Sequence, residues 1–317
     1  TDANVLRRFT HRLLLAAAFA PNTGGIATPV STPPNILAYG LLRKAGYQVS
    51  FIDWLAYGLP LSLAAFACLF ALFRNLLPLD SNVRVETVEL VDTLDKTSRA
   101  EWQTAIVFLV TVILWIVPDL LFQFGIFPDW RDWWNSRFSF ASIACASASL
   151  LFILPARSGG EGNLEAHDLG EVPWGTLLLF GGGLSLSAML MSSGLAPELA
   201  SGLGRVVGDS PVLFTMIAIL GTVFLSEFAS NTASASLILP IVISQAGAPS
   251  AAGLVLALAC TFAAGFGFMF PVSTPPNAIV YATGYVESRV LRKVGVLFDC
   301  IGILLILVGV LAVAAFD

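Results

Sequence analysis

The sequence predicts an all-α polytopic membrane protein with an inverted-repeat transporter fold, proline-broken helices and a re-entrant hairpin. Three observations predict this class. Hydrophobic residues make up 56% of the 317 residues and charged residues only 12%, which is more apolar surface than a soluble domain can bury. A helix-breaking motif of seven residues occurs twice, and one long apolar stretch is interrupted by polar residues in its middle.

The composition also excludes several classes of partner and site. The net charge of -5 is small and spread along the chain, so no nucleic acid is expected to bind; the main partner is the lipid bilayer. Four cysteines at scattered spacing indicate neither disulfides nor a zinc site. Only two histidines are present, which argues against a histidine metal centre.

Polar connectors separate eight apolar stretches, each about as long as a membrane span or longer. The connector 78–101 is rich in charged residues of both signs, and most Lys and Arg residues fall on its side of the predicted topology. The positive-inside rule therefore makes it a cytoplasmic connector. The expected location is the cell (inner) membrane, with several spans. The apolar stretches cover residues 13–28, 53–77, 102–122, 138–155, 174–200, 211–245, 251–270 and 293–316.

The motif P-V-S-T-P-P-N occurs at Pro29–Asn35 and again at Pro271–Asn277, 242 positions apart. Adjacent prolines remove amide donors and force the preceding residues out of helical geometry. Each helix must then open at membrane depth, where irregular backbone is tolerated only inside protein or along a polar cavity. Kinks that serve packing alone would explain one such motif. Two copies instead indicate an internal repeat with a central binding site, as in secondary transporters.

These features divide the chain into two halves. Residues 1–77 form the C-terminal part of the first repeat, a broken helix and the span that follows it, and 78–101 join the halves. Residues 102–317 form the second repeat, with a re-entrant hairpin at about 211–245, a broken helix at about 251–285 and a last span at about 293–316. The two broken helices are predicted to run in opposite directions across the membrane.

The stretch 211–245 is too long for one span, and Ser226–Thr232 interrupts it. Two half-length helices that meet at a polar tip would fit the bilayer. A conventional helix pair with a surface turn is the alternative, although its tip would be expected to carry Lys, Arg or Gly-Pro.

The polar residues at these breaks suggest a site for a cation beside an anion. Neutral donors and acceptors lie near carbonyls freed from helices, and ligation by uncharged oxygens suits a monovalent hard cation such as sodium better than calcium or magnesium. Hydroxyl and amide donors at half-helix N-termini suit carboxylates. The neutral side chains are Ser230, Asn231, Thr232 and Thr274, and the carbonyls are those of Ser226, Ala229 and Ser273.

Two acids lie within apolar stretches. Glu227 is the only acid in the hairpin, and intramembrane acids are usually functional. Its place beside the tip equally allows a structural role as a hydrogen-bond acceptor. For Asp299 a structural role is preferred.

These residues resemble the divalent anion/sodium symporter (DASS) family of dicarboxylate and citrate transporters. The resemblance is carried by Trp174–Leu186 (W-G-T-L-L-L-F-G-G-G-L-S-L), Ser230–Ala235 (S-N-T-A-S-A) and the duplicated S-T-P-P-N, and it covers essentially the whole chain. It implies a homodimer that works by an elevator motion, with a scaffold domain and a mobile transport domain in each protomer.

The resemblance also implies roles for individual residues. One co-transported sodium ion would be bound by Ser226, Ala229, Asn231 and Ser273. The substrate carboxylates would face Ser230, Asn231, Thr232, Thr274 and Pro275, with Thr32 and Pro33 from the other repeat. Ser31 would belong to the other sodium site, which is only partly present.

The chain departs from the family in having one Ser-Asn-Thr motif instead of two. We expect the missing motif to lie before Thr1, so that the sequence starts inside a longer protein. Pro21-Asn22-Thr23 is not a substitute, because it falls within the helix that precedes the first break.

The leading hypothesis is therefore sodium-coupled symport of a C4 dicarboxylate such as succinate, malate or fumarate. Citrate or sulfate transport, or dicarboxylate exchange, remain alternatives within the family. A cation/proton antiporter would need carboxylates at the breaks, and both S-T-P-P-N loops lack them. An enzyme is not expected, because no pair of His, Asp or Cys residues lies at a common depth.

Overall fold

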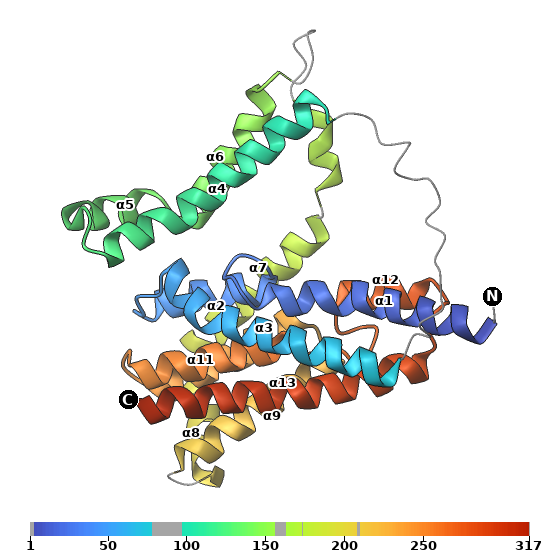
Figure 1. Ribbon diagram of the computed structural model, residues 1–317. Coiled ribbons are helices and arrows are strands. Elements are labelled where there is room, and N and C mark those ends of the chain that lie inside the picture. The colour runs from blue at the N-terminus through green and yellow to red at the C-terminus, as the bar shows by residue number, and fades with distance from the viewer. Residues whose placement is uncertain (1–2, 78–96, 156–162, 173, 208–209, 317) are drawn as a thin grey trace. The chain divides into compact units, whose positions relative to one another are not determined.

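The computed structural model describes residues 3–77, 97–155, 163–172, 174–207 and 210–316, and every regular element in these residues is a helix (Figure 1). The chain forms two compact units. The larger combines α1–α3 with α7–α13, and the smaller holds α4–α6 with two short 3-10 helices; residues 50–52, 174 and 175 belong to the smaller unit.

The larger unit contains α1 (Ala3–Gly25), α2 (Pro33–Lys44), α3 (Phe51–Leu76), α7 (Trp174–Ser192), α8 (Leu195–Val207), α9 (Pro211–Phe228), α10 (Asn231–Ala246), α11 (Ala251–Ala264), α12 (Pro275–Ala282) and α13 (Ser288–Phe316). The smaller unit contains α4 (Arg99–Gln123), η2 (Pro128–Trp130), α5 (Arg131–Arg137), α6 (Phe140–Ile153) and η3 (Ala166–Glu171).

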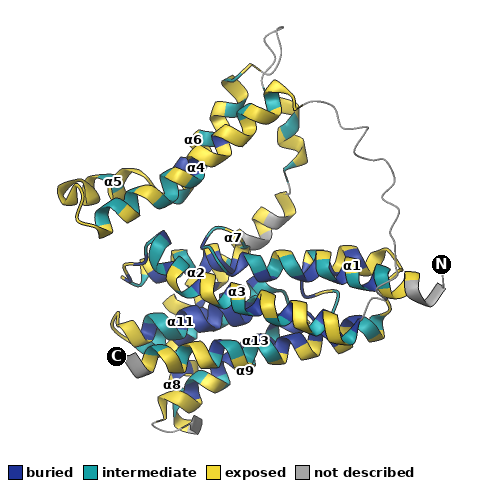
Figure 2. Ribbon diagram, viewed as in Figure 1, coloured by how far each residue is buried: buried dark blue, intermediate teal, exposed yellow. Residues whose placement is uncertain are grey.

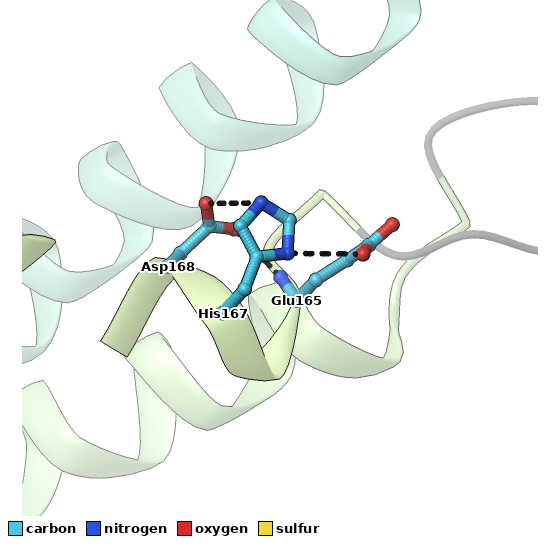
Figure 3. A network of polar contacts seen from close by, with 3 residues as sticks. All are labelled: Glu165, His167 and Asp168. Atoms are coloured by element: carbon cyan, nitrogen blue, oxygen red, sulfur yellow. Dashed lines mark hydrogen bonds and ion pairs between the residues drawn. The ribbon is translucent and has the colours of Figure 1, made fainter. Parts of the chain in front are cut away.

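In the smaller unit, α4 packs along α6, and the Thr111 hydroxyl donates to Ser147 Oγ at 2.7 Å. Helix α4 begins inside the predicted connector, where Ser98 and Glu101 form a capping box. The rest of that connector, 78–96, lies outside the described residues. Beside η3, the ring nitrogens of His167 lie 3.2 Å from a Glu165 carboxylate oxygen and 3.3 Å from one of Asp168 (Figure 3).

Four helices in the described residues, α3, α4, α9 and α13, are long and apolar enough to cross a membrane. The pair η2–α5 and α6, bent by 67°, makes a fifth if it is one span. Exposed residues recur along α3, α4 and α13 in Figure 2. They include large apolar residues such as Phe70 on α3 (64% exposed), Phe108 on α4 (67%) and Leu304 on α13 (63%). Such faces require lipid rather than water as their solvent.

Two predicted stretches have different limits in the structure. The stretch 174–200 is two helices, α7 and α8, because Gly194 takes a left-handed conformation (φ 78°) that ends α7. The last span begins at Ser288 instead of 293, so its first turns carry Arg289, Arg292 and Lys293.

The larger unit contains two series of helices in the same order, α1–α2–α3 and α11–α12–α13. Each series has a helix, a break, a short helix that starts with Pro-Pro, and a long helix. Their packing is reciprocal, since α1 packs on α12 and α2 packs on α11. Helix α13 ends at the C-terminal label of Figure 1, and α3, its counterpart, runs in the opposite direction. Antiparallel counterparts are what an inverted repeat requires.

A glycine on each long helix lets the preceding break pack directly against it. A Cβ at Gly58 of α3 would lie 2.6 Å from the Ile26 carbonyl oxygen, and one at Gly295 of α13 would lie 2.3 Å from that of Phe268. Ile26 and Phe268 occupy the same place in the two breaks. Only glycine allows this contact, so both loops are held against the helix that follows them.

Candidate functional site

The asparagine that ends each S-T-P-P-N motif ties the break loop to itself. Asn35 donates its side-chain amide to the carbonyls of Gly25 and Thr28, both at 2.8 Å. Asn277 donates to Gly267 and Phe270, at 3.2 and 3.4 Å. Each asparagine thus holds the carbonyls ten and seven residues before it. These carbonyls lost their helical partners at the break, and the amide replaces them.

Helix α9 ends at the predicted tip of the hairpin, and α10 starts after Ala229 and Ser230. The Ser230 hydroxyl caps α10 by accepting from the Ala233 amide at 3.2 Å. The α9 and α10 helices pack on one another, as two arms of a hairpin do. Their junction is the Ser-Glu-Phe-Ala-Ser-Asn-Thr segment singled out in the sequence.

Three of the predicted sodium ligands meet where this tip contacts the second break. The Ser226 hydroxyl lies 2.7 Å from Asn231 Oδ1 and 2.8 Å from the Ala264 carbonyl oxygen at the end of α11. A Cβ built on Gly267 would lie 3.0 Å from Asn231 Oδ1, 3.1 Å from Ser226 Oγ and 3.2 Å from Ser273 Cβ. Gly267 is therefore surrounded by Ser226, Asn231 and Ser273.

The backbone at the tip adds unpaired oxygens to this group. In the last turn of α9, the Leu225 carbonyl accepts from the Ala229 amide and the Glu227 carbonyl accepts from the Ser273 hydroxyl. The Ser226 carbonyl accepts none of the hydrogen bonds found among the described residues. Neutral oxygens with free lone pairs, close together and largely buried, are suited to a monovalent cation.

Glu227 fastens the hairpin tip to the second break. Its carboxylate accepts from the backbone amides of Met269 (2.9 and 3.1 Å) and Phe270 (3.1 Å) and from the Ser273 hydroxyl (3.0 Å). From α13, Asp299 accepts from the Phe268 amide at 3.3 Å. Both acids hold loop amides, which is the acceptor role that the sequence left open for Glu227 and favoured for Asp299.

The predicted substrate residues differ in how far they are buried. Thr232 and Thr274 are buried, whereas Ser230 is half-buried. Pro275 and Pro33 are exposed, and Thr32 caps α2 without a side-chain hydrogen bond. Helix α2 packs on α10, so the first motif lies beside the hairpin.

The first loop has its own cluster of hydroxyls. Ser31 is exposed and hydrogen-bonded to Thr28. A Cβ on Gly25 would meet the Thr32 side chain at 2.5 Å. Gly25 precedes its motif by the same number of residues as Gly267 does, so glycine borders the predicted ligands in both repeats.

Sequence reasoning missed Ala264, Gly267 and Asn22 as parts of the site. The two glycines at matching places before the duplicated motif were a usable signal for Gly267. The Ala264 carbonyl has no sequence signal. Asn22 donates to Thr274 Oγ1 at 3.1 Å across 252 positions of sequence, a contact that only the folded chain shows.

Residues 1–314 match the family model described as the sodium:sulfate symporter transmembrane region. The chain belongs to this family. The match includes both breaks and the hairpin, and the apolar helices make the protein a multi-pass cell membrane protein, as predicted. The resemblance to the divalent anion/sodium symporters is thereby confirmed.

Among curated relatives in this family, the sodium-dependent dicarboxylate transporter SdcS of Staphylococcus saprophyticus is 31% identical over 323 aligned positions. The protein of the same name from Staphylococcus aureus strain USA300 is also 31% identical. Each alignment covers 98% of this chain and 60% of the relative. The chain therefore spans about 60% of the length of these relatives.

Proposed function

We propose that the protein is a secondary active transporter that carries a C4 dicarboxylate such as succinate, malate or fumarate together with sodium. The observation that carries this proposal is the group of neutral oxygens around Gly267, where the hairpin tip meets the second break. Membership of the family supports it, as do relatives named as sodium-dependent dicarboxylate transporters. No catalytic role is proposed.

Sodium is proposed to bind at this group of oxygens. The ligands are Asn231 Oδ1 and the oxygens of Ser226, Ala229 and Ser273. Because Gly267 has no side chain, the space between these ligands stays open. Glu227 supplies negative charge next to the cation without being a ligand, since it is occupied with the loop amides.

The dicarboxylate is proposed to bind next to the cation. Ser230 and Thr274 are the N-caps of α10 and α12. The positive dipole ends of both helices favour a carboxylate, and α10 adds the amides of its first turn, whereas α12 starts with two prolines that have no amide hydrogen. A sodium ion and a carboxylate that are buried together offset part of each other's desolvation, which couples their binding. The proposed contacts are Ser230, Asn231, Thr232, Thr274 and Pro275.

The other repeat is proposed to complete the site, with Thr32 and Pro33 at the second carboxylate and Ser31 at a second sodium ion. Transport would follow an elevator motion within a homodimer. Asn22 of α1 bonds to Thr274, the N-cap of α12, and Glu227 of the hairpin bonds to Met269 in the loop before α12. These bonds support the proposal that α1, α12 and the hairpin move as one body.

Sulfate is the second candidate substrate, because the family model is named for sodium:sulfate symport. Citrate and an exchange mechanism are further variants of the same site. Thermal unfolding of the purified full-length protein with succinate, citrate or sulfate, each with and without sodium, ranks them. The true substrate raises the melting temperature more when sodium is present.

The decisive experiment is uptake of labelled succinate into liposomes that contain the full-length protein. Uptake should require an inward sodium gradient, and Asn231→Ala should abolish it. Asn75→Ala is a matched control on the exposed side of α3 and should leave uptake unchanged. Uptake of succinate that is independent of sodium would contradict symport.

A further inference from the structure

We infer that Asn22 is a positioning residue for substrate recognition, which it serves by directing the hydroxyl hydrogen of Thr274 toward the substrate. This inference rests on the proposed function, because Thr274 is proposed there to contact a substrate carboxylate. Asn22 lies one turn before the end of α1, in the first repeat, and Thr274 is the N-cap of α12 in the second. The two residues are 252 positions apart in the sequence.

The hydrogen bonds at Thr274 leave its hydroxyl free to act only as a donor. Oγ1 accepts from Asn22 Nδ2 at 3.1 Å and from the Asn277 amide at 3.3 Å. A threonine hydroxyl has two lone pairs and one hydrogen, so both lone pairs are used. Among the described residues no acceptor bonds to the hydrogen, and Thr274 is 3% exposed. A buried donor without an acceptor is unfavourable, and a bound carboxylate oxygen would satisfy it.

The first motif copy supports this assignment by contrast. Thr32 occupies the same position as Thr274 but makes no side-chain cap bond, and its hydroxyl takes part in no hydrogen bond found among the described residues. The residue 242 positions after Asn22 is Ala264, whose methyl side chain cannot donate a hydrogen bond. The two identical motifs therefore differ in the hydrogen bonds of their threonines, and Asn22 bonds only to the second. Only the second threonine has a fixed hydroxyl.

The χ1 angle of threonine is restricted, but its hydroxyl hydrogen rotates freely about the C–O bond. The direction of this hydrogen therefore has to be fixed by other hydrogen bonds. Without Asn22, a lone pair of Oγ1 is unoccupied and the hydroxyl can turn to present it to the substrate. A lone pair would repel a carboxylate, whereas the hydrogen attracts it. Asn22 thus acts on the substrate through Thr274, across the boundary between the repeats.

The test compares Asn22→Ala and Asn22→Asp with the wild type, as full-length protein in liposomes at saturating sodium. The KM for labelled succinate should rise about three- to ten-fold in Asn22→Ala, the range for one net hydrogen bond. It should rise more in Asn22→Asp, because a carboxylate accepts the Thr274 hydrogen and repels the substrate. The maximal rate should stay within two-fold, as should the sodium concentration for half-maximal uptake, which is measured separately by varying sodium at saturating succinate. Asn75→Ala is the matched control.

A mutant cycle with Thr274→Val separates this role from a general structural one. If Asn22 acts through Thr274, Asn22→Ala should add nothing to the KM increase of Thr274→Val. Additive effects, or a fall in maximal rate and melting temperature with KM unchanged, would overturn the inference. A wild type without sodium-driven succinate uptake would contradict the proposed function itself; wild-type uptake with unchanged KM in both Asn22 variants would contradict only the role of Asn22.

Discussion

Replacing Gly267 by alanine tests the proposed cation site with the smallest change the chain allows. The new methyl carbon would lie 3.0 Å from Asn231 Oδ1, 3.1 Å from Ser226 Oγ and 3.2 Å from Ser273 Cβ. These distances are shorter than the roughly 3.5–4.0 Å of ordinary van der Waals contact. The backbone of Gly267 is not in the left-handed region, so alanine causes no backbone strain there.

The size of the effect follows from what the methyl group displaces. It enters the space between the ligands, and at least one oxygen must move away or lose the cation. A buried polar group without its partner costs about 1–3 kcal/mol, which corresponds to about five- to 150-fold in binding. We therefore expect the sodium concentration for half-maximal uptake to rise at least about ten-fold.

The assay is succinate uptake by the full-length protein in liposomes as external sodium is varied. Gly221→Ala is the matched control, since Gly221 lies in α9 of the same hairpin and a Cβ there meets no atom within 4 Å. That variant should keep wild-type sodium dependence and gain slightly in stability, because alanine favours helix more than glycine does.

One result would refute the reasoning. If Gly267→Ala protein is folded, with the wild-type melting temperature, and keeps the wild-type sodium dependence, then the space around Gly267 does not hold the cation. A lower melting temperature with an unchanged sodium dependence would point in the same direction, because the methyl group would then disturb packing alone.

Three further substitutions test how the breaks are held. Asn35→Ala and Asn277→Ala each leave two loop carbonyls without a donor, so each should lower the melting temperature of the purified protein by the equivalent of about 2 kcal/mol or more; unchanged melting would show that water replaces the amide. Glu227→Gln puts an NH2 group toward the amide donors of the second loop. We expect a lower melting temperature and a smaller rise in melting temperature when sodium is added. If both quantities stay at their wild-type values, the carboxylate is not needed to hold the loop.

Much of this architecture could be predicted from local sequence. Pro33 and Pro34 have no amide hydrogen and suit the first turn of a helix, and α2 starts at them as the motif predicts. The polar tip of the hairpin lies at Ser230, where a hydroxyl can cap α10. Such features depend on the chemistry of neighbouring residues, and they are therefore visible in one sequence. Gly194 could have been recognised as a helix end by the same reasoning.

The contacts between distant segments could not be predicted. Gly58 and Gly295 have equivalent roles, yet they are 237 positions apart while the motifs are 242 apart. The short helix has 12 residues in the first repeat and 8 in the second, and the connection after it is one residue shorter in the second, so a comparison of the halves at one fixed spacing misses the pair. The bond from Asn22 to Thr274 likewise depends on α1 packing against α12.

The two breaks have the same backbone arrangement, and in each the motif asparagine bonds to loop carbonyls, but the remaining bonds that hold them differ. The first loop is held mainly through its carbonyls, since Trp54 donates to Ile26 and Asn35 to Gly25 and Thr28.

The second loop is also held through its amides, by two carboxylates. Glu227 accepts from two of them and Asp299 from a third. The Glu227 carboxylate brings negative charge to the second loop, whereas no acid takes part in these bonds to the first loop among the described residues. A cation beside the second loop is therefore stabilised by charge as well as by neutral oxygens, so equivalent substitutions in the two loops should have unequal effects on sodium binding.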